Sequence, residues 1–461
     1  MSIEAAFMVP HPPMIVPEIG QGGEKQIEET IRAYEAVADE IAEIQPETII
    51  ITSPHSIMYS DYFHISPGSG AKGNFGQFRA SSVKFEETYD GKLRDRICEL
   101  ADAGGFPAGT LGERSAELDH GTMVPLWFIR KKYSGGNIIR IGLSGLGLTD
   151  HYRLGEMIQK AVEETGRKVV FVASGDLSHK LQEYGPYGFS PEGPEYDKRI
   201  MDVAKRAAFD EMFSFDETFC EKAAECGHKS FVIMAGALDG LDVKAQVYSH
   251  QDVTGVGYGI ASFYPEKKNE NRRFRIAYEN ELKEKIKGMS ESADAYVNLA
   301  RQTIESYILS RKALEFPKNL PAEMFHTRAG VFVSIHKEGR LRGCIGTFLP
   351  TTECVAGEII QNAISASTKD PRFSPITPEE LPFLEINVDV LTTPEEISSP
   401  DQLDVKRYGV IVSSGQKRGL LLPDLEGVDT VEEQIEIARQ KGGIREDEDI
   451  KLQRFEVVRH K

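Results

Sequence analysis

In the first half of the chain, short runs of β-branched and other apolar residues alternate with longer stretches of helical periodicity. The runs span residues 47–52 (ETIIIT), 137–143 (NIIRIGL) and 168–173 (KVVFVA), and turn residues bound each of them. A short, continuous apolar run is typical of a strand that is buried on both faces of a sheet. Residues 24–44 and 156–165 instead carry apolar side chains at helical spacing. This alternation predicts an α/β domain with a mostly parallel central sheet flanked by helices.

The second half of the chain has a different pattern. A helical pattern over residues 292–309 is followed by alternating apolar and polar residues over 330–336 and 384–391, which predicts an α+β domain. A polar, charged stretch at 265–275 separates the two patterns and is typical of a linker. At ~100–200 residues per domain, this length allows two or three domains. The predicted boundaries are a first domain over 1–265, a linker over 266–284 and a second domain over 285–461.

Composition and charge exclude several classes of function. The formal net charge of −18 disfavours nucleic-acid binding, because an acidic surface repels phosphates. No apolar run reaches the ~20 residues that a membrane-spanning helix needs, and the N-terminus lacks the pattern of a signal peptide. The five cysteines form no CxxC pair, which argues against disulfides and against a zinc site built of thiolates. We therefore expect a cytoplasmic protein without membrane or nucleic-acid partners, and its oligomeric state stays open.

Histidines follow three of the predicted strands at the point where each strand ends. The run at residues 5–10 leads into His11, the run at 47–52 leads into His55, and the run at 168–173 leads through Ser-Gly-Asp-Leu-Ser to His179. In open α/β sheets, ligands bind beyond the carboxyl ends of the strands, so these imidazoles are expected to converge. Neutral imidazole is a common ligand of iron, copper and zinc. The pattern predicts a metal site that includes His11 and His55.

The third ligand of this predicted site has two candidates in adjacent positions. Glu225 and Cys226 precede an apolar helical stretch, and a helix N-terminus stabilises either a carboxylate or a thiolate. Glu225 would suit ferrous iron, whereas Cys226 would suit zinc or copper. The alternative is that Glu225 only favours the helix start and that Cys226 is a small buried apolar residue. Asp176 has two interpretations as well, because it can orient His179 or cap its own loop.

Taken together, these motifs resemble the LigB-type class III extradiol dioxygenases and the related Memo family. The matching segments are HPP at His11, SPHS at His55, DHGTMVPL at His120, SGDLSH at His179 and ECGHKSFVIMAGAL at Glu225. They occur in the family's order and cover most of residues 1–265.

The dioxygenase resemblance implies that His11, His55 and Glu225 bind ferrous iron (Fe²⁺). It also implies that His179 is the acid–base catalyst and that His120 lines the site of a catechol-type substrate, which would react with O₂. The ECG sequence is closer to the Memo form, in which a cysteine takes the third metal position. With Cys226 as ligand, the Memo resemblance implies a redox or modification-system component that binds copper or iron, without ring cleavage. A scaffold without metal is the third hypothesis, and it would make the four histidines coincidental.

The C-terminal region resembles the AMMECR family. The matching segments are LRGCIGT at residues 341–347, STKDPRF at 367–373 and LEINVDVL at 384–391. Chains that join the two domains resemble the AmmeMemoRadiSam group, which implies a radical-SAM protein as a partner. Within LRGCIGT, Arg342 lies two residues before Cys344, and a nearby guanidinium can lower a thiol pKa. The two residues are therefore a candidate site of the second domain, and the alternative is a turn that needs small residues.

Overall fold

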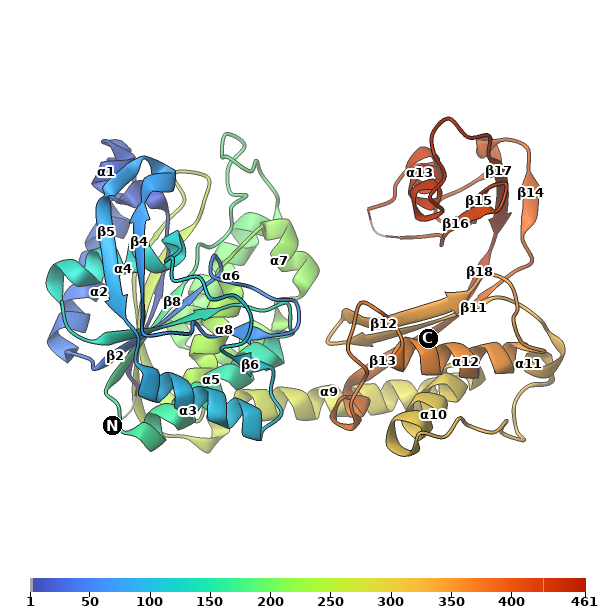
Figure 1. Cartoon of the computed structure of the whole chain (residues 1–461), viewed down its shortest axis with the longest axis horizontal. Helices are drawn as coiled ribbons and strands as arrows, with labels where there is room; N and C mark the ends of the chain where they lie inside the picture. The colour runs from blue at the N-terminus through green and yellow to red at the C-terminus, as the bar shows by residue number, and fades with distance from the viewer. Residues whose placement is uncertain (1–2, 426) are drawn as a thin grey trace. The chain divides into compact units, whose positions relative to one another are not determined.

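The computed structural model describes residues 3–425 and 427–461. The chain divides into two compact units, Met1–Glu279 and Asn280–Lys461. Each unit has its own hydrophobic core and is described by itself (Figure 1).

A six-stranded sheet forms the centre of the first unit. Its order is β7 (Asn137–Gly142), β2 (Thr48–Ser53), β8 (Val169–Ser174), β1 (Ile3–Val9), β10 (Tyr258–Lys268) and β9 (Leu241–Gln251). The first four strands run parallel, but β10 is antiparallel to β1 and β9 is antiparallel to β10. The prediction of a mostly parallel sheet is therefore wrong, because the sheet is mixed. Residues 252–257 are too few for a crossover helix, so β9 and β10 form a hairpin.

Helices cover both faces of this sheet, and the strand sequences show why. Successive side chains of a strand point to opposite faces. Val170 and Val172 of β8 join one core cluster, whereas Val169 and Phe171 join the other. The first cluster includes α2 (Glu28–Ile44) and α4 (His120–Lys132); the second includes α3 (Gly91–Ala103), α5 (Leu148–Thr165), α6 (Glu192–Arg206) and α8 (His228–Ala237). Burial on both faces explains why the predicted strand runs are continuously apolar.

Shorter elements complete the first unit. They are η1 (Pro13–Ile15), α1 (Pro17–Gly20), η2 (Gly23–Ile27), β3 (Phe63–His64), β4 (Gly70–Phe75), η3 (Gly76–Phe78), β5 (Ala80–Thr88), β6 (Ala108–Gly109), η4 (Phe209–Ser214), α7 (Glu217–Ala223) and η5 (Glu270–Arg272). The segment predicted as a linker, 266–284, contains the end of β10, η5 and the first part of α9 (Phe274–Ser292). No helix among the described residues is both long and apolar enough to span a bilayer.

The second unit contains two antiparallel four-stranded sheets. The first is ordered β12 (Arg340–Thr347), β11 (Val331–Lys337), β13 (Leu384–Leu391) and β18 (Val457–His460). The second is ordered β14 (Glu395–Ile397), β17 (Lys451–Phe455), β15 (Gly409–Ser414) and β16 (Lys417–Leu421). The remaining elements are α10 (Ala295–Ser310), α11 (Ala322–His326), α12 (Val355–Thr368), η6 (Pro378–Phe383), η7 (Pro400–Gln402) and α13 (Val431–Lys441). The strand-rich α+β texture agrees with the sequence pattern.

Candidate metal centre

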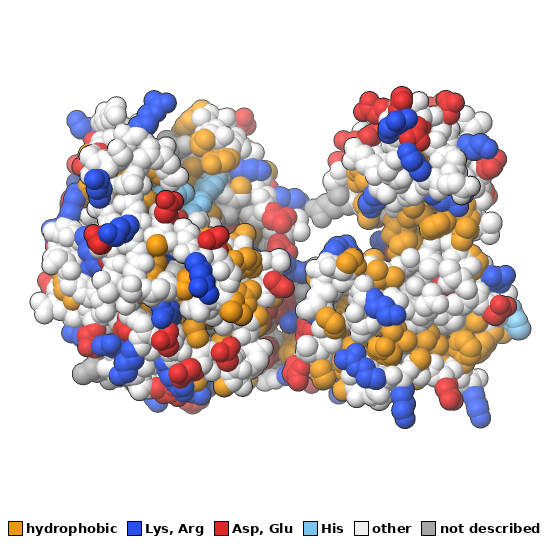
Figure 2. Space-filling view, in the orientation of Figure 1, with side chains coloured by type: hydrophobic (Ala, Val, Ile, Leu, Met, Phe, Trp, Pro, Cys, Tyr) orange, Lys and Arg blue, Asp and Glu red, His pale blue; other side chains and the backbone are white. Residues whose placement is uncertain are grey.

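The carboxyl ends of three neighbouring parallel strands carry the candidate ligands. β8 lies between β2 and β1, so the segments after these strands share one edge of the sheet. His11 follows β1 and His55 follows β2, and their Nε2 atoms lie 3.0 Å apart. The ring centroid of His120, the first residue of α4, lies 4.0 Å from that of His55. The structure therefore brings together the imidazoles that the sequence predicts to converge, and Figure 2 shows histidine side chains in a hollow of this unit.

A hydrogen-bond chain determines which nitrogen of His11 is free. The hydroxyl of Ser174 donates to the carbonyl oxygen of Gly121 at 2.6 Å, so its oxygen can only accept from His11 Nδ1, 2.9 Å away. Nδ1 therefore carries the ring proton, and Nε2 presents a lone pair toward His55. Metal-binding histidines are typically oriented in this way by a hydrogen bond from the other ring nitrogen.

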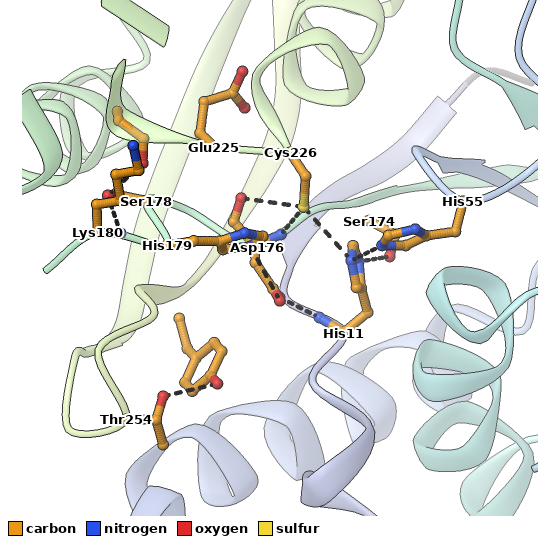
Figure 3. Close-up of polar contacts among 12 residues, drawn as sticks. His11, His55, Ser174, Asp176, Ser178, His179, Lys180, Glu225, Cys226 and Thr254 are labelled. Atoms are coloured by element: carbon orange, nitrogen blue, oxygen red, sulfur yellow. Dashed lines mark hydrogen bonds and ion pairs between the residues drawn. The ribbon is translucent and has the colours of Figure 1, made fainter. Parts of the chain in front are cut away.

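Cys226 completes a group of three potential ligand atoms. Its Sγ lies 3.6 Å from His11 Nε2, and the ligand atoms of His11, His55 and Cys226 all lie within 4.8 Å of one another (Figure 3). An ion bound at ~2.0 Å from nitrogen and ~2.3 Å from sulfur holds such atoms roughly 3–4 Å apart. The three residues thus fit a single transition-metal ion.

Glu225 lies outside this group, although it is adjacent to Cys226 in sequence. Its carboxylate accepts a hydrogen bond from the backbone N–H of His228 at 2.6 Å, at the start of α8. Figure 3 shows the Glu225 and Cys226 side chains leaving the backbone in different directions, with only the sulfur directed toward His11. Surrounding protein displaces water from the carboxyl group and raises the pKa of Glu225 to about 7. In this arrangement Glu225 stabilises a helix end, which is the alternative that the sequence left open.

Two glycines allow Cys226 to approach the loop after β8. A β-carbon on Gly175 would lie 2.1 Å from the Cα of Gly227, so neither loop tolerates a side chain at this contact. The close contact places Cys226 Sγ 3.3 Å from the backbone nitrogen of Asp176, which donates to it. The glycines in the SGD and CGH segments therefore set the position of the sulfur.

Asp176 and His179 lie on the other side of Cys226. One carboxylate oxygen of Asp176 accepts the backbone N–H of His11 at 2.7 Å, and the other lies 3.9 Å from His179 Nε2. The ring of His179 stacks on Tyr187 with a centroid distance of 5.1 Å. The ligand atoms of Asp176, His179 and Cys226 form a second group within 4.8 Å of one another. Asp176 thus holds the His11 backbone, and its second oxygen faces His179 without a hydrogen bond.

The imidazoles of this site are held in their neutral form. Burial, together with the neighbouring His55 ring, lowers the pKa of His11 to about 3, and the same causes lower the pKa of His120 to about 3. Loss of surrounding water also lowers the pKa of His55 and of His179 below the usual 6.5, while Asp176 opposes the shift in both cases. Neutral imidazoles offer lone pairs, so the electrostatics of the site suit a bound cation.

Two family models match the chain. The model described as the catalytic LigB subunit of aromatic ring-opening dioxygenase matches residues 5–261, which is more than half of the chain. The chain belongs to this family. The AMMECR1 model matches residues 297–460, so a LigB domain is joined to an AMMECR1 domain, as the motifs predicted. We refer to Met1–Glu279 as the LigB unit and to Asn280–Lys461 as the AMMECR1 unit.

Similar proteins occur in bacteria and in archaea. Protein CA_C1420 of Clostridium acetobutylicum is 41% identical over 469 aligned residues, which cover 100% of both chains. A protein of Thermotoga maritima is 52% identical over 168 residues, which are 36% of this chain and 97% of its own. Among solved structures, protein PH0010 of Pyrococcus horikoshii is 35% identical and covers 37% of this chain and 91% of its own, with a TM-score of 0.34.

Sequence reasoning did not single out two residues that support the site of the LigB unit. Ser174 orients His11, as described above. Asp119 caps α4 by accepting the backbone N–H of Thr122 at 2.9 Å, and it also accepts the hydroxyl of Ser53 at 2.6 Å. It thereby ties the end of β2, which leads to His55, to the start of α4, which carries His120. The sequence pointed to these residues only by their positions, Ser174 in SGDLSH and Asp119 in DHGTMVPL.

In the AMMECR1 unit, Arg342 and Cys344, the two residues predicted to act together, have different partners. Arg342 forms a two-point ion pair with Glu380, with nitrogen–oxygen distances of 2.9 and 3.0 Å. The guanidinium beside Cys344 belongs instead to Arg372, which donates to the Cys344 carbonyl at 3.3 Å. The Cys344 Sγ lies 3.3 Å from the hydroxyl of Ser334 on β11. The partly buried carboxylate of Glu380 in η6 holds the Arg342 guanidinium, so this arrangement does not provide a thiol activated by Arg342.

Proposed function

We propose that the LigB unit is a metal-binding redox domain that holds a transition-metal ion through His11, His55 and Cys226 and does not cleave aromatic rings. The position of Cys226 carries this proposal, because its sulfur lies 3.6 Å from His11 Nε2 while the carboxylate of Glu225 caps α8. Two imidazoles and a thiolate form a softer set than two imidazoles and a carboxylate, which favours copper or zinc over ferrous iron. A bound copper ion would supply one-electron chemistry.

The surrounding side chains support such a centre in separate ways. Ser174 keeps the proton of His11 on Nδ1 and thereby keeps Nε2 available. His120 packs between His55 and Phe78, with ring centroids 4.0 and 5.5 Å away, and covers one side of the imidazole pair. The backbone N–H of Asp176 donates to Cys226 Sγ and stabilises negative charge on the sulfur. These contacts orient the donors before any ion arrives.

The presence of two domains in one chain supports the part of the proposal that concerns partners. A LigB domain and an AMMECR1 domain occur in one chain. We place the metal centre in a redox or modification system in which a radical-SAM protein is the partner and the AMMECR1 unit contacts substrate or partner.

A ring-cleaving dioxygenase acting on a catechol-type molecule with O₂ is the second candidate. The match to the LigB model and the convergence of His120 and His179 on the site favour it. It would use ferrous iron with Glu225 as the third ligand and His179 as the acid–base catalyst. For that, Glu225 would have to leave the N-terminus of α8 and displace Cys226.

Metal retention distinguishes the two candidates. The full-length protein is purified without oxygen, loaded with copper, zinc or ferrous iron in turn, desalted, and analysed for metal content. We expect His55→Ala and Cys226→Ala to bind less copper or zinc than the unaltered chain and Glu225→Ala to bind as much. An oxygen-uptake screen with catechols is expected to show no ring-cleaved product with any of the metals.

The opposite pattern would favour the dioxygenase. If Glu225→Ala loses iron, Cys226→Ala keeps it and a catechol is cleaved, the redox proposal is wrong. Circular dichroism of each variant separates loss of a ligand from loss of the fold. Cys220→Ala is the matched cysteine control, because Cys220 lies on α7 outside both groups of ligand atoms.

A further inference from the structure

A second set of metal-competent atoms adjoins the first. It consists of Asp176, His179 and Cys226, whose ligand atoms all lie within 4.8 Å of one another, and it shares only Cys226 with the first set. The Asp176 carboxylate and His179 Nε2 are 3.9 Å apart, which is too far for a hydrogen bond. Two ligands of a common ion are separated by roughly this distance. The gap between the two side chains therefore has the dimensions of a cation site.

Asp176 and His179, the two residues that belong only to the second set, are held in place by contacts that leave their facing atoms available. One oxygen of Asp176 accepts the backbone N–H of His11, so the other oxygen is the one near His179. The backbone N–H of His179 donates to Ala223, and its ring stacks on Tyr187. Neither residue would need a new backbone arrangement to bind an ion.

Cys226 belongs to both sets and lies between the histidines of the first set and the Asp176–His179 pair of the second (Figure 3). Its sulfur is 3.6 Å from His11 Nε2 on one side and accepts the Asp176 N–H at 3.3 Å on the other. A thiolate has more than one lone pair and can bind two cations at once. In two-metal sites the ions lie ~3.5–4 Å apart, and two ions each ~2.3 Å from one sulfur reach this separation when they bind it at a bent angle.

We propose that the LigB unit binds two transition-metal ions that share the Cys226 sulfur, one with His11 and His55 and the other with Asp176 and His179. This inference rests on the proposed function and adds a second ion to its metal centre. The donors are mainly nitrogen and sulfur, so cobalt, zinc or copper suits both positions better than magnesium or calcium.

The charges of the donor atoms indicate what kind of further ligand a two-ion site would bind. Metal ligands bind in their deprotonated forms, so Cys226 and Asp176 would bring two negative charges and the three histidines would bind as neutral imidazoles. Two divalent ions would leave an excess of positive charge, which a hydroxide or an anionic oxygen ligand between them would offset. The two-ion form therefore favours an anionic substrate, whereas a single divalent ion leaves the site neutral.

Cobalt(II) is a suitable probe, because its content and its magnetism are both measurable. The full-length protein is titrated with cobalt(II) without oxygen, desalted, and examined by elemental analysis and electron paramagnetic resonance. We expect about two cobalt ions per chain, magnetically coupled through the sulfur. His179→Ala and His55→Ala should each retain about one uncoupled ion, and Cys226→Ala should bind at least tenfold more weakly at both positions. The matched control Cys220→Ala should retain about two coupled ions.

Each result that would contradict the proposal overturns a different part of it. About one cobalt ion in the unaltered chain, unchanged by His179→Ala, would overturn the second ion and leave the single centre intact. No bound cobalt would overturn both proposals. Two uncoupled ions that survive Cys226→Ala would overturn the shared sulfur. Asp176→Asn and His179→Gln repeat the test with smaller changes, and circular dichroism identifies any variant that fails to fold.

Discussion

Gly175 and Gly227 meet so closely that a β-carbon on Gly175 would lie 2.1 Å from the Gly227 Cα. This contact joins the loop after β8 to the turn before α8 and thereby places Cys226 beside Asp176 and His11. Gly175→Ala should push the two loops apart, lower metal affinity at least tenfold and destabilise the fold by about 1–3 kcal/mol. Metal titration and denaturant unfolding measure the two effects. Gly91→Ala, where the nearest atom is 3.6 Å away at the end of a flexible arginine, should change neither.

Ser174→Ala tests the orientation of His11. Without the hydroxyl that accepts from Nδ1, the imidazole can rotate or place its proton on Nε2, so metal affinity should fall ~10–100-fold. Competition with a coloured chelator measures the change. Ser230→Ala is the control, since it removes another buried hydroxyl, one that donates to Thr52 rather than to a histidine. Equal affinities for Ser174→Ala and the unaltered chain would contradict this role of Ser174.

Metal binding should release a proton from Cys226. The pKa of this thiol is raised because the surrounding protein displaces water, whereas His11 and His55 are already neutral near pH 7. A metal ion must therefore displace about one proton from the sulfur, and its apparent affinity should fall as the pH falls. Titration in a weakly buffered solution counts the protons. Cys226→Ala should release none in its residual binding, and proton release equal to that of the unaltered chain would contradict the assignment.

In the AMMECR1 unit, Asp370 should stabilise the turn that contacts Cys344. Its carboxylate accepts hydrogen bonds from Arg372 and from the Cys344 backbone N–H, and the Arg372 guanidinium lowers the pKa of Asp370 to about 2. Because the pKa in the folded state is below that of the unfolded chain, the stabilisation is present above pH ~3.9 and is lost as the pH falls toward 2. Asp370→Asn should cost about 1–2 kcal/mol near neutral pH.

Denaturant unfolding at several pH values checks this prediction. The difference in unfolding free energy between Asp370→Asn and the unaltered chain should shrink below pH ~4. Asp401→Asn is the control, because Asp401 is exposed in η7 and has no ion pair among the described residues. A difference that stays constant with pH would show that the charge of Asp370 contributes nothing.

The sequence was sufficient for the parts of the site that depend on strand ends. The apolar runs before His11, His55 and His179 indicate buried strands, and parallel pairing through β8 then makes convergence unavoidable. It was insufficient for choosing between Glu225 and Cys226. These residues are adjacent, and which side chain enters the site depends on the turn before α8, which the distant contact with Gly175 determines.

Two further differences between the predictions from sequence and the structure also arise from tertiary contacts. The antiparallel course of β9 and β10 depends on the short connection at 252–257. Apolar and polar residues alternate over 241–247 of β9, but this alternation does not show which strand β9 pairs with or in which direction. Spacing along β12 suggested that Arg342 lies near Cys344, but Glu380, almost forty residues away, holds its guanidinium. Local patterns do not contain such long-range partners.

The position of β1 inside the sheet affects how metal is lost from the centre. This strand is paired on both sides, with β8 and with β10, and every residue from Ala5 to Val9 is buried. Its amides should exchange with deuterated water only on global unfolding, as the innermost strands of a domain do. His11, the residue after Pro10, is therefore anchored to the slowest-opening segment of the unit, whereas His55 is the exposed histidine of the group. Loss of metal from the protein should begin at the histidine that faces solvent.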